Sequence, residues 1–462
     1  MAQTFIPYPI DVVATVAAIR RDWPAVVWLD GDAGGDHSII SAAPREQLIS
    51  RGGETWVADP LSDRPARALG KGDPLAHLRE RLGPVRPGQG PFAGGAIGYF
   101  SYELGRRLQG QTVADAGMPE MAVGLYDWAL VLDHRRHRAW LAGEPPAALA
   151  DALTGAAAQS PGPWSTGGHV QCAPGFGDYA EAFHRVMGYL RDGDCYQVNL
   201  ARRFRGDFEG DPLGLYRDFR TRAGGPFAAY LELPGGPILS GSPERFLRLR
   251  DGCVETCPIK GTRPRQADPA ADARARESLL SSAKDRAENV MIVDLLRNDI
   301  GRCCATGTVT VPRLCALESF ATVHHMVSVV TGRLDPRFHA TDLLRDCLPG
   351  GSITGAPKYR AMEIIDELED GPRGVYCGAI GYIGYDGAMD SNIAIRTMTA
   401  RDGQLDYHAG GGLVMDSACR EEYDETRAKA EAFCGVVEQG GQTHVAEQQF
   451  PFDADMMQSF DR

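Results

Sequence analysis

Lysine is rare in this chain of 462 residues, in which 43 of the 48 basic side chains are arginine and only 5 are lysine. Arginine stays protonated at any workable pH, whereas a lysine amine can lose its proton and become a nucleophile. Lys260 lies in the short turn Pro258–Arg263, and no carboxylate stands at a helical spacing that would pair with it. A lysine on the surface of a turn is the ordinary interpretation of such a residue. The rarity of lysine and the motifs that surround Lys260 favour a chemical role instead.

Two stretches with helical periodicity each carry a pair of carboxylates three residues apart. Asp285 and Glu288 form the first pair, and Glu422 and Glu425 form the second. Side chains at this spacing lie on one face of a helix. Solvated faces with local ion pairs, such as Glu425 with Lys429, would explain either pair taken alone. Four convergent carboxylates would instead offer the hard oxygen ligands that Mg²⁺ prefers, but spacing within a helix does not show whether the helices face each other.

Several further features could hold an anionic group. Gly410–Gly412 follows a predicted strand, and consecutive glycines let backbone amides approach an anion, although a flexible connection explains them equally well. Arg396 is predicted to lie buried in an apolar strand, where it would need an internal salt bridge or an anionic ligand. The segment 349–358 is a glycine-rich turn without the Gly-Lys-Ser/Thr order of a Walker loop. His325 is explained more simply as a satisfied core histidine.

The composition restricts the classes of partner. The formal net charge of −13 argues against nucleic acid or an anionic membrane as the main partner. The segment 1–23 lacks the order of a signal peptide, and no apolar run approaches membrane-spanning length. The cysteines are scattered and match no zinc-ligand spacing, which favours reduced thiols and a cytoplasmic location.

A mixed α/β framework is expected to position these residues. Residues 1–155 are predicted to form an N-terminal region, 156–175 a linker, 176–437 the motif-dense region and 438–462 a poorly ordered tail. The predicted strands are 25–29, 39–42, 94–102, 122–132, 195–204, 227–233, 375–383, 392–400 and 405–408. The predicted helices are 11–23, 179–191, 274–299 and 417–437. The dipeptide Asp402-Gly403 predicts a hairpin between the last two strands.

One short segment is echoed within the chain, because Gly95–Tyr102 resembles Gly378–Tyr385. Eight residues do not establish a duplication. The similarity does predict that both halves of the chain contribute similar strands to packed sheets. A boundary near residue 160 would then not separate independent folding units.

Taken together, the motifs of the second half resemble those of the chorismate-binding enzymes. The matching segments are Ser240–Phe246, Pro258–Arg265, Asp285–Arg302, His325–Ser328, Gly355–Lys358, Ile393–Thr397 and Glu422–Thr426. The resemblance is dense from about residue 176 to residue 435 and weaker toward the N-terminus. It implies an α/β fold of the α+β type, in which two large antiparallel sheets pack together, with helices outside and the active site between the sheets.

The resemblance also implies a metal site. Glu288 and Glu425 match the Mg²⁺ ligands of the family, with Asp285 and Glu422 as close or water-mediated partners. Members of the family usually carry glutamate at the position of Asp285. The metal is expected to hold the ring carboxylate of chorismate.

Further residues match positions that bind the rest of the substrate. The resemblance implies that Tyr376, Arg396 and the amides of Gly411-Gly412 hold the enolpyruvyl carboxylate of chorismate. His325 and Ser352 match positions that line the pocket, and Ser352 replaces a threonine that is frequent in the family.

Lys260 separates two branches of the family. Members that form anthranilate have alanine at this position, and members that form 4-amino-4-deoxychorismate have lysine. The resemblance therefore implies that a neutral Lys260 attacks C2 of chorismate as the C4 hydroxyl leaves, and that ammonia then adds at C4 and expels the lysine. Glu244 resembles the general acid/base of the family and would protonate the leaving hydroxyl.

The sequence also bears on the source of ammonia and on alternative functions. No cysteine lies in the Gly-x-Cys-x-Gly context of a glutamine amidotransferase, so ammonia must come free from solution or from a separate glutaminase subunit. The resemblance implies the separate subunit. The main alternative is anthranilate formation, which eliminates pyruvate and does not depend on Lys260. Isochorismate formation uses a lysine of a different segment. A catalytically inactive chorismate-binding scaffold is the alternative from another functional class.

Overall fold

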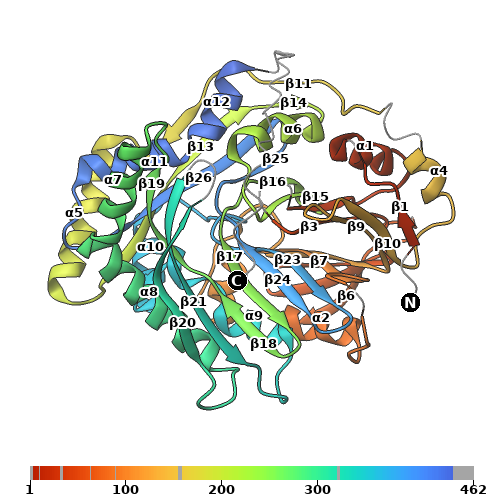
Figure 1. Cartoon of the computed structure of the whole chain (residues 1–462), viewed down its shortest axis with the longest axis horizontal. Coiled ribbons are helices and arrows are strands. Elements are labelled where there is room, and N and C mark those ends of the chain that lie inside the picture. Colours follow the sequence, from red (N-terminus) through yellow and green to blue (C-terminus); the bar gives the residue numbers. More distant parts are fainter. Residues whose placement is uncertain are drawn as a thin grey trace.

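The computed structural model describes residues 4–9, 11–31, 35–62, 64–88, 90–154, 159–319 and 323–440. Within these residues, two large antiparallel sheets pack together and helices cover their outer faces (Figure 1), which confirms the predicted fold class. The predicted tail lies outside the described residues from residue 441 onward, as does a part of the predicted linker. No helix in the described part of the chain is long and apolar enough to cross a membrane.

The first sheet, sheet A, has twelve strands among the described residues. In spatial order they are β1 (Thr4–Ile6), β10 (Arg138–Gly143), β9 (Trp128–Asp133), β3 (His37–Ser41), β2 (Val27–Asp30), β15 (Ala228–Leu233), β16 (Gly236–Ser240), β25 (Thr397–Arg401), β26 (Gln404–Leu413), β13 (Gln197–Asp207) and β12 (Gln171–Ala173), with β22 (Gly355–Ala356) also paired to β13. The predicted hairpin at Asp402-Gly403 is confirmed, because it joins β25 to β26.

The second sheet, sheet B, also has twelve strands in the part of the chain that the structure describes. In spatial order they are β19 (Ile259–Pro264), β21 (Val323–Arg333), β18 (Cys253–Thr256), β17 (Arg245–Arg250), β24 (Met389–Ile393), β23 (Ala379–Gly384), β7 (Gly95–Phe100), β8 (Met121–Tyr126), β4 (Glu46–Arg51), β5 (Glu54–Ala58) and β6 (Arg67–Lys71), with β20 (Thr310–Ser319) paired to β21. A separate short ladder joins β11 (Trp164–Ser165) to β14 (Glu209–Gly210).

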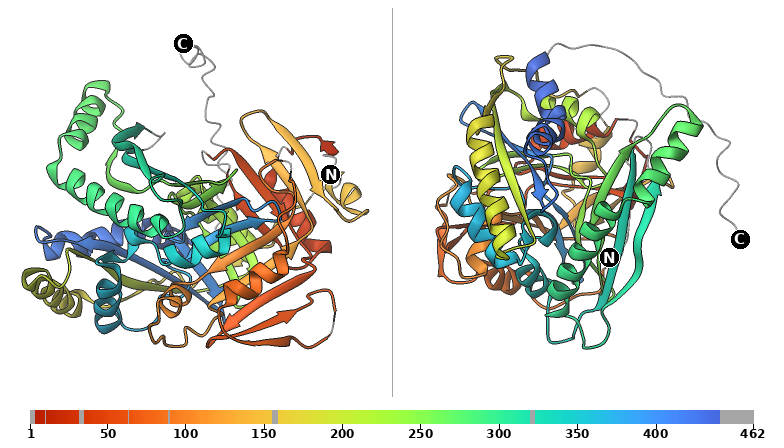
Figure 2. Two further views of the ribbon diagram at one scale, coloured as in Figure 1. Left: turned by 90° about the horizontal axis from the view of Figure 1, so that it is seen from below. Right: turned by 90° about the vertical axis from the view of Figure 1, so that its left-hand side faces the viewer.

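The helices lie around the two sheets. Their bounds are α1 (Val12–Asp22), α2 (Pro74–Leu82), α3 (Tyr102–Leu108), α4 (Leu149–Thr154), α5 (Phe176–Asp192), α6 (Pro212–Ala223), α7 (Pro269–Leu280), α8 (Ala283–Gly301), α9 (Ala340–Cys347), α10 (Lys358–Leu368), α11 (Cys419–Lys429), α12 (Glu431–Gln439) and the 3₁₀ turn η2 (Gly351–Ile353). Figure 2 shows α7 (green) projecting from the body, at the opposite end of the left view from the red and orange N-terminal strands.

Strands from both halves of the chain lie side by side in each sheet. In sheet A, β2 of the N-terminal half pairs with β15, and in sheet B, β7 pairs with β23. The two echoed segments are therefore direct neighbours, with Gly98 opposite Gly381. A Cβ at Gly98 would lie 2.2 Å from the carbonyl oxygen of Ala122, and one at Gly381 would lie 2.2 Å from that of Asp390. Glycine is needed at both positions because the outer neighbouring strands approach so closely.

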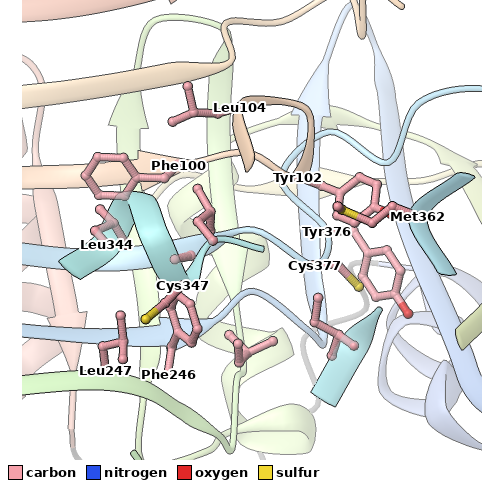
Figure 3. Close-up of a cluster of buried hydrophobic side chains, with 14 of the residues drawn as sticks. Phe100, Tyr102, Leu104, Phe246, Leu247, Leu344, Cys347, Met362, Tyr376 and Cys377 are labelled. Atoms are coloured by element: carbon pink, nitrogen blue, oxygen red, sulfur yellow. The ribbon is translucent and has the colours of Figure 1, made fainter. Parts of the chain in front are cut away.

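The core follows the alternation of side chains along the strands. In β9, Trp128, Leu130 and Leu132 pack under the helices outside sheet A, whereas Ala129 and Val131 face the core between the sheets. A third cluster lies between the helices and strands of both sheets, among them β7 and β17 of sheet B and β13 of sheet A, and Figure 3 labels ten of its members. The two sheets and their outer helices therefore pack in layers and form one continuous framework.

Both long helices predicted from the sequence are interrupted. The stretch 274–299 is divided between α7 and α8, because Ser282 caps α8 by accepting a hydrogen bond of 3.2 Å from the backbone N–H of Asp285. The stretch 417–437 is divided between α11 and α12 at Ala430. The prediction of two uninterrupted helices was wrong, since serine side chains can replace helical backbone bonds and end a helix locally.

The predicted strand 392–400 is also interrupted. β24 ends at Ile393 and β25 begins at Thr397, and between them Arg396 has a φ of 49°, in the left-handed region. Arg396 is exposed rather than buried, so the prediction of a buried arginine within a strand was wrong. The predicted strand 375–383 begins only at Ala379.

Candidate active site

An irregularity in strand β19 positions Lys260. The register between β19 and β21 shifts between Ile259 and Thr262, which leaves Lys260 and Gly261 out of the regular ladder. Gly261 has a φ of 79°, which favours glycine. Such a bulge changes the direction of the adjacent side chain. The ammonium nitrogen Nζ of Lys260 donates a hydrogen bond of 3.3 Å to the carbonyl oxygen of Ser352.

Ser352 links Lys260 to the predicted acid, Glu244. Glu244 lies between β16 and β17 and is buried. Its Oε1 accepts a hydrogen bond of 2.9 Å from the hydroxyl of Ser352. One residue of η2 therefore contacts the predicted nucleophile through its backbone and the predicted acid through its side chain.

The electrostatics of this pair favour a neutral amine and a neutral acid. Burial lowers the pKa of Lys260, and the positive charge of Lys429 lowers it further, while the charge of Glu244 opposes both. Burial raises the pKa of Glu244, against the opposing effects of Lys260 and the Ser352 hydroxyl. Both shifts disfavour the charged form, as expected for ionisable groups removed from water. A nucleophile and a proton donor need these protonation states.

The structure brings the two carboxylate pairs together. Burial raises the pKa of Glu288 on α8, and the negative charges of Asp285 and of Glu422 on α11 raise it further. Burial likewise raises the pKa of Glu422, with a further contribution from Glu425. The charges of Glu288 and Glu422, on two different helices, therefore lie within interaction range of each other. Sequence spacing could not show this proximity.

Other polar groups hold three of these carboxylates in place. The contacts are Asp285 with Arg263 (3.1 Å), Glu425 with Lys429 (2.6 Å) and Glu422 with the Ser417 hydroxyl (2.7 Å). Among the described residues, no group of three or more His, Cys, Asp or Glu side chains is drawn into a metal-coordinating arrangement. The carboxylate oxygens are nevertheless of the type that Mg²⁺ prefers, and their mutual repulsion would be relieved by a divalent cation. The donor set therefore fits Mg²⁺ in its chemistry.

The glycines at the end of β26 let side chains of α11 and β13 approach the backbone of β26 closely. A Cβ at Gly411 would lie 2.9 Å from Oε2 of Glu422 and 4.0 Å from Nζ of Lys429. A Cβ at Gly412 would lie 2.9 to 3.2 Å from the side-chain amide of Gln197. Glycine is favoured at these two positions because a side chain there would collide with the Glu422 carboxylate or the Gln197 amide.

The remaining predicted residues lie around the same region. The Tyr376 ring is buried and stacks on His408, with the ring centroids 5.4 Å apart, and Figure 3 shows Tyr376 among the buried side chains of the third cluster. His325 is buried, and its Nδ1 shares a hydrogen bond of 2.8 Å with the Thr262 hydroxyl. Burial lowers the pKa of His325 to about 4, and the charge of Arg396 contributes, so Arg396 is exposed but close to His325.

A second lysine clamps the turn that carries Ser352. Nζ of Lys358 lies 2.6 Å from Oδ2 of Asp299 and donates a hydrogen bond of 3.0 Å to the carbonyl oxygen of Cys347. At the other end of the turn, the buried Arg373 donates a hydrogen bond of 3.2 Å to the carbonyl oxygen of Ile353. Lys358 therefore ties the end of α9, before the turn, to α8, and Arg373 holds the last residue of η2.

Sequence reasoning missed three residues of this region. The first is Lys429, which donates a hydrogen bond of 3.0 Å to the carbonyl oxygen of Gly410 and whose positive charge acts on Lys260. It is one of only five lysines, and this rarity was the available signal. Gln197 and Asn199 are buried amides at alternate positions of β13. Polar residues two apart in a buried strand share one face, which was the available signal for them.

Comparison with known proteins agrees with this geometry. The family model described as chorismate binding enzyme matches residues 24–435. The chain therefore belongs to the chorismate-binding enzyme family.

Its relatives include enzymes of two kinds. The chain is 47% identical over 410 residues to aminodeoxychorismate synthase component 1 of Klebsiella aerogenes, covering 84% of this chain and 87% of the relative. It is 38% identical over 397 residues to anthranilate synthase component 1 of Streptomyces coelicolor, covering 79% and 78%. The solved structure of anthranilate synthase component I from Streptococcus pneumoniae superposes with a TM-score of 0.74 at 31% identity, covering 87% of this chain and 92% of that one.

Proposed function

We propose that the chain catalyses the amination of chorismate to 4-amino-4-deoxychorismate, for p-aminobenzoate and folate synthesis. The observation that carries this proposal is the joining of Lys260 and Glu244 through Ser352, because it combines a nucleophile with a proton donor. The higher identity to the aminodeoxychorismate synthase than to the anthranilate synthase supports the same branch of the family.

The first step forms a covalent adduct. The neutral amine of Lys260 attacks C2 of chorismate, the two ring double bonds shift, and the C4–O bond breaks. Glu244 gives its proton to the departing hydroxyl, which leaves as water. The buried setting lowers the pKa of Lys260 and raises that of Glu244, so both pKa shifts are in the direction of the forms that this step consumes.

The second step releases the product. Ammonia adds at C4, the double bonds return to their original positions, and the C2–N bond to Lys260 breaks with its electron pair on the lysine nitrogen. The carboxylate of Glu244 takes a proton from the new ammonium group and becomes an acid again. The enolpyruvyl ether bond is not touched, so the sum is chorismate plus ammonia giving aminodeoxychorismate plus water.

Mg²⁺ is proposed as the cofactor. Glu288 and Glu425 would hold it, with Asp285 and Glu422 nearby, and when bound it would neutralise the ring carboxylate of chorismate. The contacts that Arg263 and Lys429 make with these carboxylates keep the negative charges compensated in its absence.

A separate glutamine amidotransferase subunit is proposed to supply the ammonia, since the relatives are named as a component 1. A cytoplasmic location is proposed because all eleven cysteines are free thiols, including the adjacent and buried Cys303 and Cys304.

The test is product identification by mass spectrometry after incubation with chorismate, Mg²⁺ and an ammonium salt. Aminodeoxychorismate without pyruvate release is expected, and activity should be lost with a chelator and restored by Mg²⁺. Fluorescent anthranilate with an equal amount of pyruvate would contradict the proposal. No turnover of chorismate under any of these conditions would favour the inactive scaffold.

A further inference from the structure

Strand β13 carries two buried amide side chains whose nitrogens have no hydrogen-bond partner among the described residues, and both lie beside the candidate active site. Asn199 is 5% exposed and Gln197 is 0% exposed. Within the described residues, Nδ2 of Asn199 and both amide atoms of Gln197 have no hydrogen-bond partner. A buried polar group left without a partner costs about 1–3 kcal/mol, so such groups are rare without a reason.

The backbone of Asn199 is fixed on both sides. Its N–H donates a hydrogen bond of 2.9 Å to the carbonyl oxygen of Thr354, and its own carbonyl oxygen accepts one of 2.7 Å from Arg373. Thr354 lies two residues after Ser352, which contacts Lys260. Asn199 is therefore anchored to the turn that joins the nucleophile to the acid, and its amide cannot leave this region by a backbone shift.

Both amides face groups expected to hold a carboxylate. Asn199 is directly opposite Gly412 in the ladder between β13 and β26, and the amide of Gln197 lies over the same glycine. The amide of Asn199 also faces the hydroxyl of Tyr376, and it opposes the rise in the pKa of Tyr376 that burial causes. The geometry of that approach does not give Nδ2 a regular hydrogen bond. An anion beside Gly412 would supply the missing acceptor.

We propose that Asn199 and Gln197 are substrate-binding residues whose N–H groups donate to the enolpyruvyl carboxylate of chorismate. This inference rests on the proposed function, since it takes chorismate as the ligand. The two amides add neutral donors to a site whose cation, Arg396, is exposed. Holding this carboxylate keeps the enolpyruvyl group in place during a reaction that leaves it attached.

The test compares Asn199→Leu with the unaltered protein in steady-state kinetics. Removal of a donor to a charged group should raise KM for chorismate about 10- to 100-fold. kcat should change by less than about threefold, because this contact is present in both substrate and transition state. Asn199→Asp should raise KM for chorismate more, because the new carboxylate would repel the enolpyruvyl carboxylate. KM within twofold of the original in Asn199→Leu would overturn the proposal.

A stability measurement separates binding from structure. Asn199→Leu removes an unsatisfied polar group, so Tm without chorismate should stay the same or rise. Thr55→Val is the matched control, since the Thr55 hydroxyl on β5 is also buried and without a partner but lies near the opposite edge of sheet B from Lys260. The control should leave KM unchanged. If Asn199→Leu does not fold, Gln197→Met is the second variant, with the same expected rise in KM.

Binding in the Lys260→Ala background distinguishes this inference from the proposed function. Chorismate should raise the Tm of Lys260→Ala but raise that of Lys260→Ala/Asn199→Leu much less at the same concentration. Equal rises in both proteins would overturn the subsite and leave the proposed function standing. No rise in either protein would contradict chorismate as the ligand and therefore both proposals.

Discussion

Lys260 and Lys358 both lie near the turn η2, but they meet different partners. Lys358 lies 2.6 Å from the carboxylate of Asp299, which is 1% exposed, and also binds the carbonyl of Cys347. Lys260 binds only the carbonyl of Ser352, and the described residues include no carboxylate in a salt bridge with it. Both are rare lysines in a chain that otherwise uses arginine.

The difference shows how the partner decides what a buried lysine can do. Lys358 forms a buried ion pair with a carboxylate at contact distance, so it serves the structure. Lys260 has no carboxylate at that distance among the described residues, so burial outweighs the more distant charges of Glu244, Glu288 and Glu425 and lowers the pKa of Lys260. Four predictions test this contrast.

Lys260→Ala should have the largest effect on activity. Loss of the nucleophile should lower kcat for aminodeoxychorismate formation at least about 10³-fold, with Tm nearly unchanged. Lys260→Arg keeps a positive charge but cannot act as a nucleophile, so it should be equally inactive. Full activity in either variant, measured by mass spectrometry of the product, would exclude a covalent role for this lysine.

Lys358→Met should act on stability instead. Removal of one partner leaves the buried charge of Asp299 uncompensated, which should lower the free energy of unfolding by about 3–5 kcal/mol. Adding Asp299→Leu should recover most of this loss, because the pair is then replaced by apolar groups. Denaturant unfolding measures both. A double variant no more stable than Lys358→Met would show that the charge of Asp299 is not the cause.

Ser352→Ala tests the link between Lys260 and Glu244. The carbonyl bond to Lys260 remains, but Glu244 loses the hydroxyl that lowers its pKa and orients it. A loss of about tenfold in kcat is expected from one hydrogen bond. Ser352→Thr keeps the hydroxyl and should retain activity. Equal activity of the alanine and threonine variants would mean that the hydroxyl has no part in the reaction.

The pH dependence should give the smallest effect. As pH rises, the neutral amine is gained through the lowered pKa of Lys260, and the protonated acid is lost through the raised pKa of Glu244. The pair should titrate as a unit and give a bell-shaped profile whose limbs lie closer together than for ordinary lysine and glutamate. The pH profile of the residual activity of Glu244→Gln should lack one of the two limbs. An unchanged bell-shaped profile in that variant would mean that another group causes this limb.

Much of the local structure could be predicted from the sequence, because it depends on neighbours in the chain. Asp402-Gly403 predicted the hairpin between β25 and β26, and the helix now assigned as α5 was predicted from its apolar periodicity. The long helices were predicted as continuous, because a serine such as Ser282 is tolerated within a helix. In the structure, the Ser282 hydroxyl accepts a hydrogen bond from the Asp285 N–H, and this cap separates α7 from α8. Periodicity predicted one strand over residues 392–400, but the left-handed backbone conformation of Arg396 interrupts it.

The residue types of the candidate site were visible in the chain, whereas their assembly was not. A rare lysine, two carboxylate pairs at helical spacing and a run of glycines are properties of short segments, and chemistry follows directly from them. The contacts that join them span 92 residues from Lys260 to Ser352 and 108 from Ser352 to Glu244. Such contacts depend on the packing of two sheets that draw neighbouring strands from both halves of the chain. Only the folded protein therefore decides that Lys260 has no carboxylate at salt-bridge distance among the described residues, that Glu288 and Glu422 come within interaction range, and that two amide nitrogens of β13 have no hydrogen-bond partner in this part of the chain.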